Sequence, residues 1–486
     1  MRFSMILCAM MCAIAGAVQV VDVSPPTRLS TKVQKVRIIG KNQDGYVVRF
    51  SGDGEMIQVY SPEMRLVTAK NIDYKGMEGE IQHILLNKSG ASVLFLDGDR
   101  RQTQLLAQPV NGKFVEAGKP LLIDSFYDRP ELVNANLHFK LSLDQNYILF
   151  YYPVFRGGMI EKMQLTCMDR GLNVLYRVLI AVNRPERDME YAMALVDNSG
   201  NGYLIFAAEP NGKDRTYGDA FHVVRIDRYD GTQLTFNMKV EKEIFGEPAF
   251  DIDNVNGSLL FSGFYDETGA ASDPAATGVF YQQLDARNGQ VKHSVYAPFQ
   301  ASFIRELTGR EPSAMNNRLY TFQVKKMIPR MDGGALIAAE SFIKDRREVM
   351  TMAPSMMTPY NSYRTINTYT FNDIIAFSLL PDGQLEWSQV MRKKQSSEDD
   401  NGFNSSFGVM NQKDRLHFVF MDEIGSSGSV NEYVLNSKGE STRNNLFNQD
   451  DKDLFVIPRQ LRQVAPDEVL MPSMKGTNFR LVKISF

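Results

Sequence analysis

Cysteine is scarce in this 486-residue chain, which has three, and two of them, Cys8 and Cys12, lie within the first 12 residues. Beyond that segment Cys167 stands alone, in an alternating run without a neighbouring His. A single cysteine forms no internal disulfide, which excludes a small extracellular scaffold held by disulfides, so the mature chain has to be stabilised by its core. We expect Cys167 to be a small buried side chain rather than a reactive thiol.

Histidine is also rare, and the sequence lacks the usual catalytic and cofactor-binding motifs. None of the five histidines is spaced as a metal-binding pair. There is no nucleophile elbow of the Gly-x-Ser-x-Gly type, no phosphate-binding loop and no dinucleotide fingerprint. We therefore predict no catalytic residue, no metal and no cofactor. His417 alternates with Leu416 and Phe418, which favours a solvent-facing or hydrogen-bonded structural role.

One segment partly matches a calcium loop. Residues 197–202 (Asp-Asn-Ser-Gly-Asn-Gly) carry oxygen donors at alternate positions and a glycine at the sixth. The twelfth position of such a loop needs a carboxylate, and Ala208 stands there. An Asx-rich turn before a strand is therefore the better interpretation.

Charge of one sign is not in excess, since 54 basic residues face 57 acidic ones and the net charge is −3. The short basic clusters are interrupted or followed by acids, as at residues 344–348 and 392–400. Such a distribution is typical of solvated faces and argues against a nucleic-acid partner.

Long hydrophobic runs are absent after the first residues. Arg2 is followed by a mostly apolar, uncharged run at residues 3–18, which is shorter than the roughly 20 residues a membrane-spanning helix needs. This pattern predicts a signal peptide at residues 1–17, cleaved after Ala15 or Ala17. The mature chain is then expected to be secreted or periplasmic, with no membrane span, and to be associated with the cell envelope.

Strand signals dominate the remainder, in short alternating or β-branched runs bounded by Gly, Asn, Asp or Pro. An Asp/Asn-Gly hairpin recurs at residues 377–387, 224–236 and 281–293. Glycine is favoured at these positions because a tight hairpin turn requires positive φ, which glycine adopts at little energetic cost. The glycines expected in such turns, including three in weaker matches, are Gly383, Gly231, Gly289, Gly171, Gly112 and Gly439.

Each hairpin belongs to a larger unit that begins with a candidate inner strand. The eight candidates are residues 46–50, 92–96, 147–151, 203–206, 258–261, 335–338, 416–420 and 468–471. Five of the seven intervals between them are 46 to 56 residues, close to the length of a four-stranded propeller blade. We predict an all-β, eight-bladed β-propeller filling residues 18–486 as a single domain, with seven blades as the alternative if the first and last units share a sheet. A strand within residues 31–39 would complete the last blade and close the ring.

Two long intervals mark insertions at about residues 299–318 and 343–372. Loops of that length are uncommon unless they carry function or disorder. The second insertion is rich in adaptable methionines and in tyrosines, so it either covers the ring or contacts a partner. The predicted binding residues are Met350, Met352, Met356, Met357, Tyr360, Tyr363 and Tyr369.

The repeated hairpin resembles the secreted β-propeller repeat proteins of bacterial envelopes, and more distantly the quinoprotein-type and WD40-like propellers. Residues 380–387 (Leu-Pro-Asp-Gly-Gln-Leu-Glu-Trp) are similar to the Leu-Asp-x-x-x-Gly-x-x-x-Trp motif of the quinoprotein type. The resemblance implies that Trp387 docks one sheet on the next. Phe236 and His293 occupy comparable places in their own units.

Because the repeat is scaffold, function is expected in the loops and insertions. The predicted function is a non-catalytic, envelope-associated binding or scaffold protein that recognises a polypeptide or glycan. The alternative is a propeller hydrolase or lyase acting on carbohydrate or peptide, with acids from residues 398–400 or 450–453. Two carboxylates and an aromatic platform at the ring axis would favour the enzyme. An exposed Met and Tyr patch would favour binding. The sequence leaves the oligomeric state open.

Overall fold

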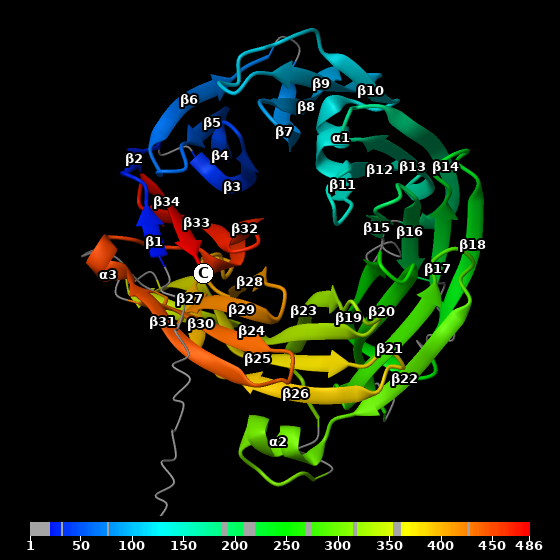
Figure 1. Cartoon of the computed structure of the whole chain (residues 1–486), viewed down its shortest axis with the longest axis vertical. Coiled ribbons are helices and arrows are strands. Elements are labelled where there is room, and N and C mark those ends of the chain that lie inside the picture. The colour runs from blue at the N-terminus through cyan, green and yellow to red at the C-terminus, as the bar shows by residue number, and fades with distance from the viewer. Residues whose placement is uncertain are drawn as a thin grey trace, which may run out of the picture.

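The computed structural model describes residues 20–30, 33–74, 77–185, 193–207, 219–267, 274–313, 318–352, 361–424 and 428–486. In these residues the chain forms eight antiparallel sheets arranged as a closed ring (Figure 1). The protein is an eight-bladed β-propeller, as predicted, and the seven-bladed alternative is wrong because the first and last units form separate sheets.

Each sheet has four main strands; in blades 1 to 7 they follow one another along the chain, and in blade 8 the fourth strand comes from the start of the chain. Blades 1 to 4 contain β3(Val33–Asn42), β4(Gly45–Gly52), β5(Glu55–Tyr60) and β6(Leu66–Ile72); β7(Glu78–Leu86), β8(Ala91–Gly98), β9(Thr103–Val110) and β10(Leu121–Phe126); β11(His138–Leu141), β12(Tyr147–Arg156), β13(Met159–Asp169) and β14(Val174–Pro185); and β15(Met193–Val196), β16(Gly202–Ala207), β17(Asp219–Ile226) and β18(Gln233–Lys239).

The second half of the ring is built in the same way. Blades 5 to 8 contain β19(Glu243–Asp253), β20(Ser258–Asp266), β21(Gly278–Asp285) and β22(Val291–Pro298); β23(Phe322–Pro329), β24(Ala335–Met352), β25(Asn361–Leu379), β26(Leu385–Met391) and the short β27(Gln395–Glu398); β28(Phe407–Asn411), β29(Arg415–Met421), β30(Ser429–Asn436) and β31(Ser441–Asn448); and β32(Arg462–Ala465), β33(Glu468–Lys475), β34(Asn478–Ser485), β1(Val20–Val23) and β2(Thr27–Arg28).

The strand nearest the axis is the first strand of each sheet, as Figure 1 shows for β3, β7 and β11. The eight segments predicted as inner strands are instead the second strands, such as β4 and β33, so that assignment was wrong. The reason is burial: β4 is buried along almost its whole length between neighbouring blades, whereas β3 alternates buried and exposed positions. A continuous apolar run is the stronger sequence signal.

The ring is closed by a strand that comes earlier than predicted. β1 pairs antiparallel with β34, from Val20 opposite Ser485 to Val23 opposite Val482. The predicted segment, residues 31–39, instead falls largely in β3, the first strand of blade 1, and residues 31–32 lie outside the described part. Blade 8 therefore combines strands from both ends of the chain, and β1 covers the edge of β34 that would otherwise be unpaired.

The hairpin glycines dock neighbouring blades. Gly289 has φ 74°, and a Cβ there would lie 2.2 Å from the ring of Phe236 on the preceding blade. Gly439, with φ 82°, lies against Trp387 in the same way, and the Trp387 indole donates a hydrogen bond to the Ser437 carbonyl (3.2 Å). Trp387 and Phe236 therefore dock sheet on sheet as the resemblance implies.

The same contact at the next junction uses a residue other than the one expected. Val295, rather than His293, packs against Gly383. In the two weaker hairpins of blades 2 and 3 the positive φ falls on Phe114 and Leu172 instead of Gly112 and Gly171. The docking surface is therefore general, while the side chain that fills it varies from blade to blade.

Several residues singled out in the sequence have structural roles. Cys167 is fully buried among apolar residues of blades 3 and 4, and burial raises the pKa of its thiol to about 12. His417 is buried and hydrogen-bonded to Glu432 (2.7 Å) and Gln412 (3.1 Å), as expected. Asp197 accepts the backbone N–H groups of residues 199 and 201, which is an Asx turn.

The helices are few and peripheral. α1(Pro130–Asn136) lies between blades 2 and 3, and α3(Gln449–Lys452) follows β31. The predicted insertion at 299–318 contains α2(Ala301–Thr308), which packs Phe303 and Ile304 against blades 5 and 6 on the outside of the ring (Figure 1). None of the helices in the described part of the chain is long and apolar enough to cross a membrane.

Candidate functional site

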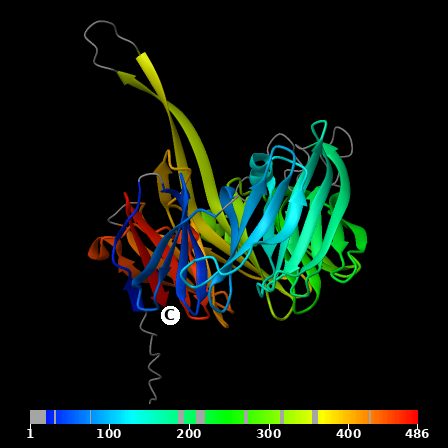
Figure 2. The same ribbon diagram turned by 90° about the horizontal axis from the view of Figure 1, so that it is seen from above.

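The insertion at residues 343–372 is not a loop but an extension of two strands. β24 and β25 are 18 and 19 residues long, about twice the length of the other strands of their sheet. Their inner parts pair with β23 and β26, while their outer parts continue past the blade, from Asp345 opposite Thr368 to Met352 opposite Asn361. We call residues 345–352 and 361–368 the arm; Figure 2 shows it projecting from one face of the ring.

The arm consists of two strands that pair mainly with each other. Within the described residues, only β27 pairs with it, and only at its base, where Glu398 lies opposite Thr368. An isolated two-stranded ribbon is marginally stable in water, so the arm depends on what holds its root.

The root is held by a buried ion pair. The Lys393 Nζ lies 2.7 Å from the Glu340 carboxylate, and both side chains are fully buried. Lys393 also donates to the Phe371 carbonyl (3.0 Å) and to Gln395 Oε1 (2.8 Å). Burial lowers the pKa of Lys393, and the neighbouring Glu340 carboxylate opposes that shift. The pair stands where the register of β24 and β25 shifts, between Glu340 and Phe342.

This network also joins the arm to blade 7. Ser406 Oγ donates to the second Glu340 oxygen (2.6 Å), and Gln395 Nε2 donates to the Met421 carbonyl (2.6 Å) on β29. Tyr369 adds a further contact, since its hydroxyl donates to Asn401 (2.7 Å) and Lys344 lies over its ring. The direction in which the arm leaves the ring is therefore fixed by side chains of two blades.

The acidic run at residues 398–400 supports the arm. Glu398 pairs with Arg347 (2.6 Å) and Asp399 with Arg364 (3.0 Å). The Asn367 backbone N–H and the Arg364 guanidinium hold the pKa of Asp399 below its usual range. Asp400 accepts the N–H of the turn at residue 402.

In the other acidic cluster Asp453 pairs with Lys475 (2.6 Å), and that ion pair holds the pKa of Asp453 below its ordinary value. Of the candidate catalytic acids, Glu398, Asp399 and Asp453 are thus held in ion pairs and Asp400 stabilises a turn.

The predicted binding residues divide into three groups. Tyr363 lies on the arm with 63% of its side chain exposed, and the strand register sets Met350 opposite it and Met352 opposite residue 361. Tyr369 is buried at the root, so it is not part of an exposed patch. The remaining three, Met356, Met357 and Tyr360, lie outside the described residues.

The ring axis carries a second feature. A cavity there is lined by first strands of blades 1 to 3 and by residues 460–462, and Glu80 is the single carboxylate among the described residues that line it. Groups of three or more potential metal-ligating side chains do not occur in the described part of the chain.

Comparisons with known proteins add little beyond overall similarity. No protein-family model matches the chain, and no curated protein matches its sequence. Among solved structures it is similar to the WD40 domain of SCAP from fission yeast, with 9% identity, a TM-score of 0.40 and coverage of 96% of this chain and 98% of that one.

Two further solved structures have similarly low identities and TM-scores. An uncharacterized protein from Listeria monocytogenes has 11% identity and a TM-score of 0.38, over 82% of this chain and 94% of that one. The acylaminoacyl peptidase from Pyrococcus horikoshii has 9% identity and a TM-score of 0.36, over 93% of this chain and 57% of its own. The fold assignment rests on the eight sheets themselves.

Sequence reasoning located the arm but missed its root. Glu340 stands in the apolar run at residues 335–341, and a carboxylate in such a run is a signal of a buried partner. Lys393 lies some fifty residues later, in a segment that was interpreted as a solvated basic cluster. The pairing between them follows from the hairpin geometry of blade 6 and could not be inferred from spacing.

Proposed function

We propose that this chain is a non-catalytic binding protein of the cell envelope, secreted or periplasmic, that recognises a polypeptide partner through the arm. The observation that carries the proposal is the pairing of the arm: two strands extend past their blade and, in the described residues beyond β27, pair only with each other. Above the contacts with β27 and Asp399, each arm strand therefore has an outer edge whose backbone N–H and C=O groups are not paired with a third strand among the described residues.

Such edges favour a polypeptide over a glycan. An extended peptide adds to a sheet edge through main-chain hydrogen bonds, and alternate side chains then provide specificity. The charged run at residues 344–348 would oppose uncontrolled pairing, because charges on an edge strand are a common protection against aggregation. Exposed Tyr363 and Val349 supply apolar area next to these charges.

The arm is also rigidly attached, which supports a recognition role. A fully buried ion pair, two side-chain hydrogen bonds to blade 7 residues or backbone, and the Tyr369–Asn401 contact fix its root. Presenting a fixed edge lowers the entropic cost of binding.

The hydrolase alternative gains no support from the ring axis. Paired-acid hydrolysis of glycosides requires two carboxylates at a defined separation, and the described residues of the axial cavity provide only Glu80.

The experiment is site-specific crosslinking in envelope extract. A photoreactive residue replaces Tyr363 on the arm, and in a matched control it replaces Tyr127, which is 87% exposed on blade 2. We expect one defined protein to be captured from position 363 and not from position 127. Equal capture at both positions, or capture of no polypeptide from 363, would overturn the proposal.

A shortened arm provides the second half of the test. Replacing residues 346–367 by an Asn-Gly turn leaves the root contacts of Lys393 and Tyr369 in place. The shortened protein should unfold at the same urea concentration as the parent and lose the crosslinked partner in competition. Retained competition would contradict the arm as the binding element.

Export is a separate part of the proposal and is supported only by the sequence pattern at residues 1–18. It predicts that the protein from fractionated cells starts at Gly16 or Val18, which mass spectrometry of its N-terminal peptide measures. An intact Met1 in the envelope fraction would contradict it.

A further inference from the structure

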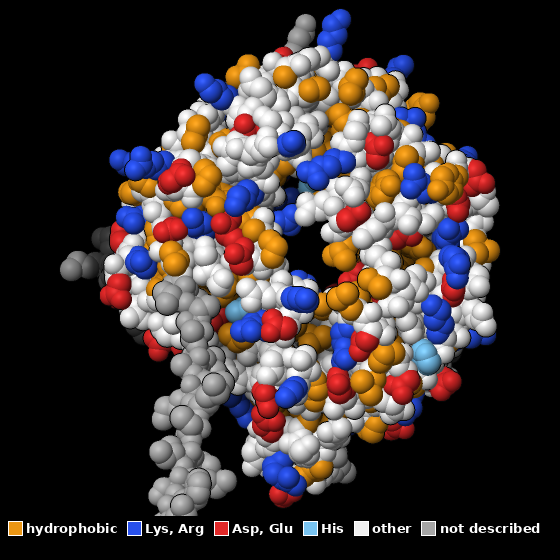
Figure 3. Space-filling view, in the orientation of Figure 1, with side chains coloured by type: hydrophobic (Ala, Val, Ile, Leu, Met, Phe, Trp, Pro, Cys, Tyr) orange, Lys and Arg blue, Asp and Glu red, His pale blue; other side chains and the backbone are white. Residues whose placement is uncertain are grey.

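The centre of the ring is hollow, as the space-filling view shows (Figure 3). The cavity has a volume of about 800 Å³, within the range of small-molecule and side-chain binding pockets. Its walls come from the inner strands β3, β7 and β11 and from the segment that enters β32. Side chains far apart in the sequence therefore meet around one space.

The cavity wall is strongly cationic. Its described lining contains Lys35, Arg37, Arg49 and Arg462, against the single carboxylate of Glu80. A chain with nearly equal numbers of acids and bases would be expected to balance such a group, so the excess is local.

Two of the four cations are neutralised. Arg49, on β4, is buried and binds the buried Glu55 carboxylate with two N–H groups, one at 2.7 Å. Lys35 pairs with Glu80 (3.2 Å), which lies 3.8 Å from Arg49. Arg49 and Lys35 thus have structural partners.

Arg37 and Arg462 have no comparable partner. Among the described residues, no carboxylate oxygen lies within the 4 Å of an ion pair for either guanidinium, and neither makes a side-chain hydrogen bond there. Burial lowers the pKa of Arg37, and repulsion by Arg49 and Arg462 adds to that shift against the opposing effect of Glu80. Two like charges therefore face one cavity, and neither has an ion-pair partner among the described residues.

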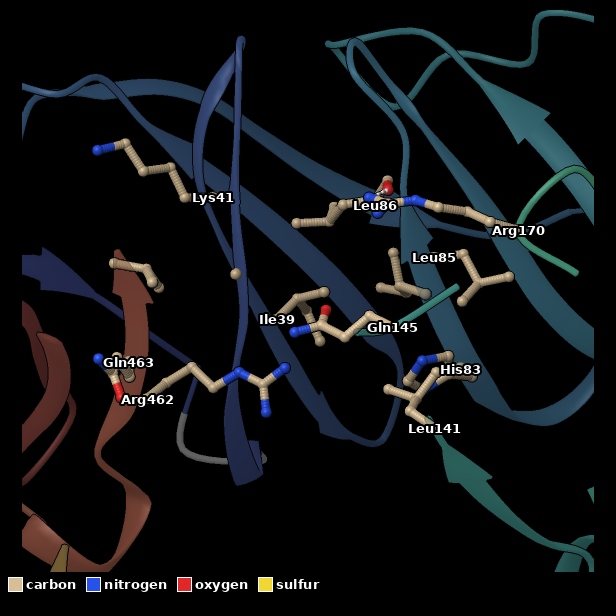
Figure 4. A pocket seen from close by; sticks show the side chains of 13 residues that line it. Ile39, Lys41, His83, Leu85, Leu86, Leu141, Gln145, Arg170, Arg462 and Gln463 are labelled. Carbon is tan, nitrogen blue, oxygen red and sulfur yellow. Dashed lines mark hydrogen bonds between the residues drawn. The ribbon is translucent and has the colours of Figure 1, made fainter. Parts of the chain in front are cut away.

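A smaller cavity of about 120 Å³ continues from the first and shares Arg462 and His83 with it (Figure 4). Arg170 reaches it and donates to the Leu86 carbonyl (2.5 Å). Burial, with repulsion from Arg37, Arg462 and Arg49, lowers the pKa of His83 to about 3, so this imidazole is neutral near pH 7. Burial is the larger cause of this shift, and the cationic wall adds to it.

The larger cavity, of about 800 Å³, also has an apolar side. Phe139 on β11, whose ring lies 4.3 Å from that of His83, forms part of it together with Leu137, Leu141 and Phe403. A pocket with a few convergent charged groups and an otherwise apolar wall is typical of a binding site.

We propose that the axial cavity binds a ligand bearing carboxylate or phosphate oxyanions, held by Arg37 and Arg462. A guanidinium presents its N–H groups in a planar fork that matches the two oxygens of a carboxylate or phosphate. The bound anion would supply the counter-charge that the two arginines lack, and the apolar wall would take the carbon skeleton of the ligand. This site is separate from the arm, so the two can be tested independently.

The test is isothermal titration of the full chain with three probes: inorganic phosphate, citrate and hexaglutamate. Binding of phosphate alone identifies a phosphate-type ligand, and tighter binding of citrate or hexaglutamate identifies a free or peptide-borne carboxylate. We expect at least one probe to bind, more weakly as salt is added. Binding of none of the three at millimolar concentration would overturn the proposal.

Substitution assigns the site. Arg37→Gln and Arg462→Gln should each weaken the tightest probe by about 10-fold or more, as expected for loss of a charge-assisted hydrogen bond. The exposed Arg100→Gln on blade 2 is the matched control and should change affinity by less than about 2-fold, the scale of a screened surface charge. Unchanged affinity in both cavity variants would overturn the assignment, and the arm-shortened chain should bind like the parent.

Discussion

Two groups of charged side chains lie inside the ring, and they differ in how their charge is balanced. At the arm root Lys393 and Glu340 are fully buried and paired, and hydrogen bonds to the Phe371 carbonyl, Gln395 and Ser406 surround them. Around the axis Arg37 and Arg462 face a cavity whose one described carboxylate, Glu80, pairs with Lys35, and neither arginine has an ion pair among the described residues. The comparison indicates that charge serves structure at the root and remains available for a ligand at the axis.

The largest expected effect is at the root. Lys393→Met leaves the Glu340 carboxylate buried without a cation, and breaking such a pair costs about 3–5 kcal/mol. The measurement is urea unfolding followed by the fluorescence of Trp387, the only tryptophan, which lies at the same junction of blades 6 and 7. The double variant with Glu340→Gln should recover more than half of the loss. A loss below about 1 kcal/mol in the single variant would contradict a structural pair.

Two arginines on adjacent strands offer a sharper contrast. Arg49→Gln removes the bidentate partner of buried Glu55, which also accepts the Ile81 N–H (3.2 Å) and so joins blades 1 and 2. We expect a loss of about 2–4 kcal/mol in unfolding free energy. Arg37→Gln, the matched variant on β3, should lose none. Equal losses in the two variants would show that Arg37 also serves the fold.

A pH effect should report the burial of His83 beside the unbalanced charge. The pKa of this imidazole is about 3 in the folded protein and about 6.5 when exposed, so below pH 6.5 the unfolded chain takes up a proton that the folded one does not. Stability is therefore constant above pH 7 and falls as the pH drops toward 3, by about 1 kcal/mol between pH 7 and 5.5 from this group alone.

His83→Gln should remove that part of the pH dependence. In the variant Arg37→Gln one repelling charge is gone, so the pKa of His83 is lowered less. The unfolding free energy of this variant should therefore fall less as the pH drops. An identical pH profile in His83→Gln and the parent would contradict the burial of this imidazole beside the cationic wall.

The smallest effect is expected at the arm surface. Arg347 and Glu398 are both more than half exposed, so Arg347→Gln should change the unfolding free energy by less than about 1 kcal/mol. The same urea series measures it. A loss as large as that of Lys393→Met would show that the ion pairs along the arm, rather than its buried root, hold it in place.

The sequence predicted the architecture well because its strongest signals belong to the most buried strands. The hairpin glycines and the continuous apolar runs gave eight blades correctly. The innermost strands were missed because several are only four residues long, as β11, β15 and β32 are, and because β3 carries charges on alternate positions that face the cavity. The closing strand β1 was missed because it directly follows the apolar run at residues 3–18.

The functional regions were predicted less completely. Composition drew attention to residues 343–372, but charges and methionines hid the strand pattern, and Tyr369 was assigned to the surface although it anchors the root. The axial cluster was not anticipated at all, because Arg37 and Arg462 come from opposite ends of the chain and meet only when the ring closes. A charged side chain on a first strand indicates a binding site only once it is known that this strand faces the axis of the ring.

The most direct test of the contrast between balanced and unbalanced charge is the unfolding free energy of the double variant Arg37→Gln/Arg462→Gln in buffer free of phosphate and carboxylates. The account predicts stability equal to or above that of the parent, together with loss of oxyanion binding. A fall in stability of the size expected for Lys393→Met, with binding retained, would contradict it.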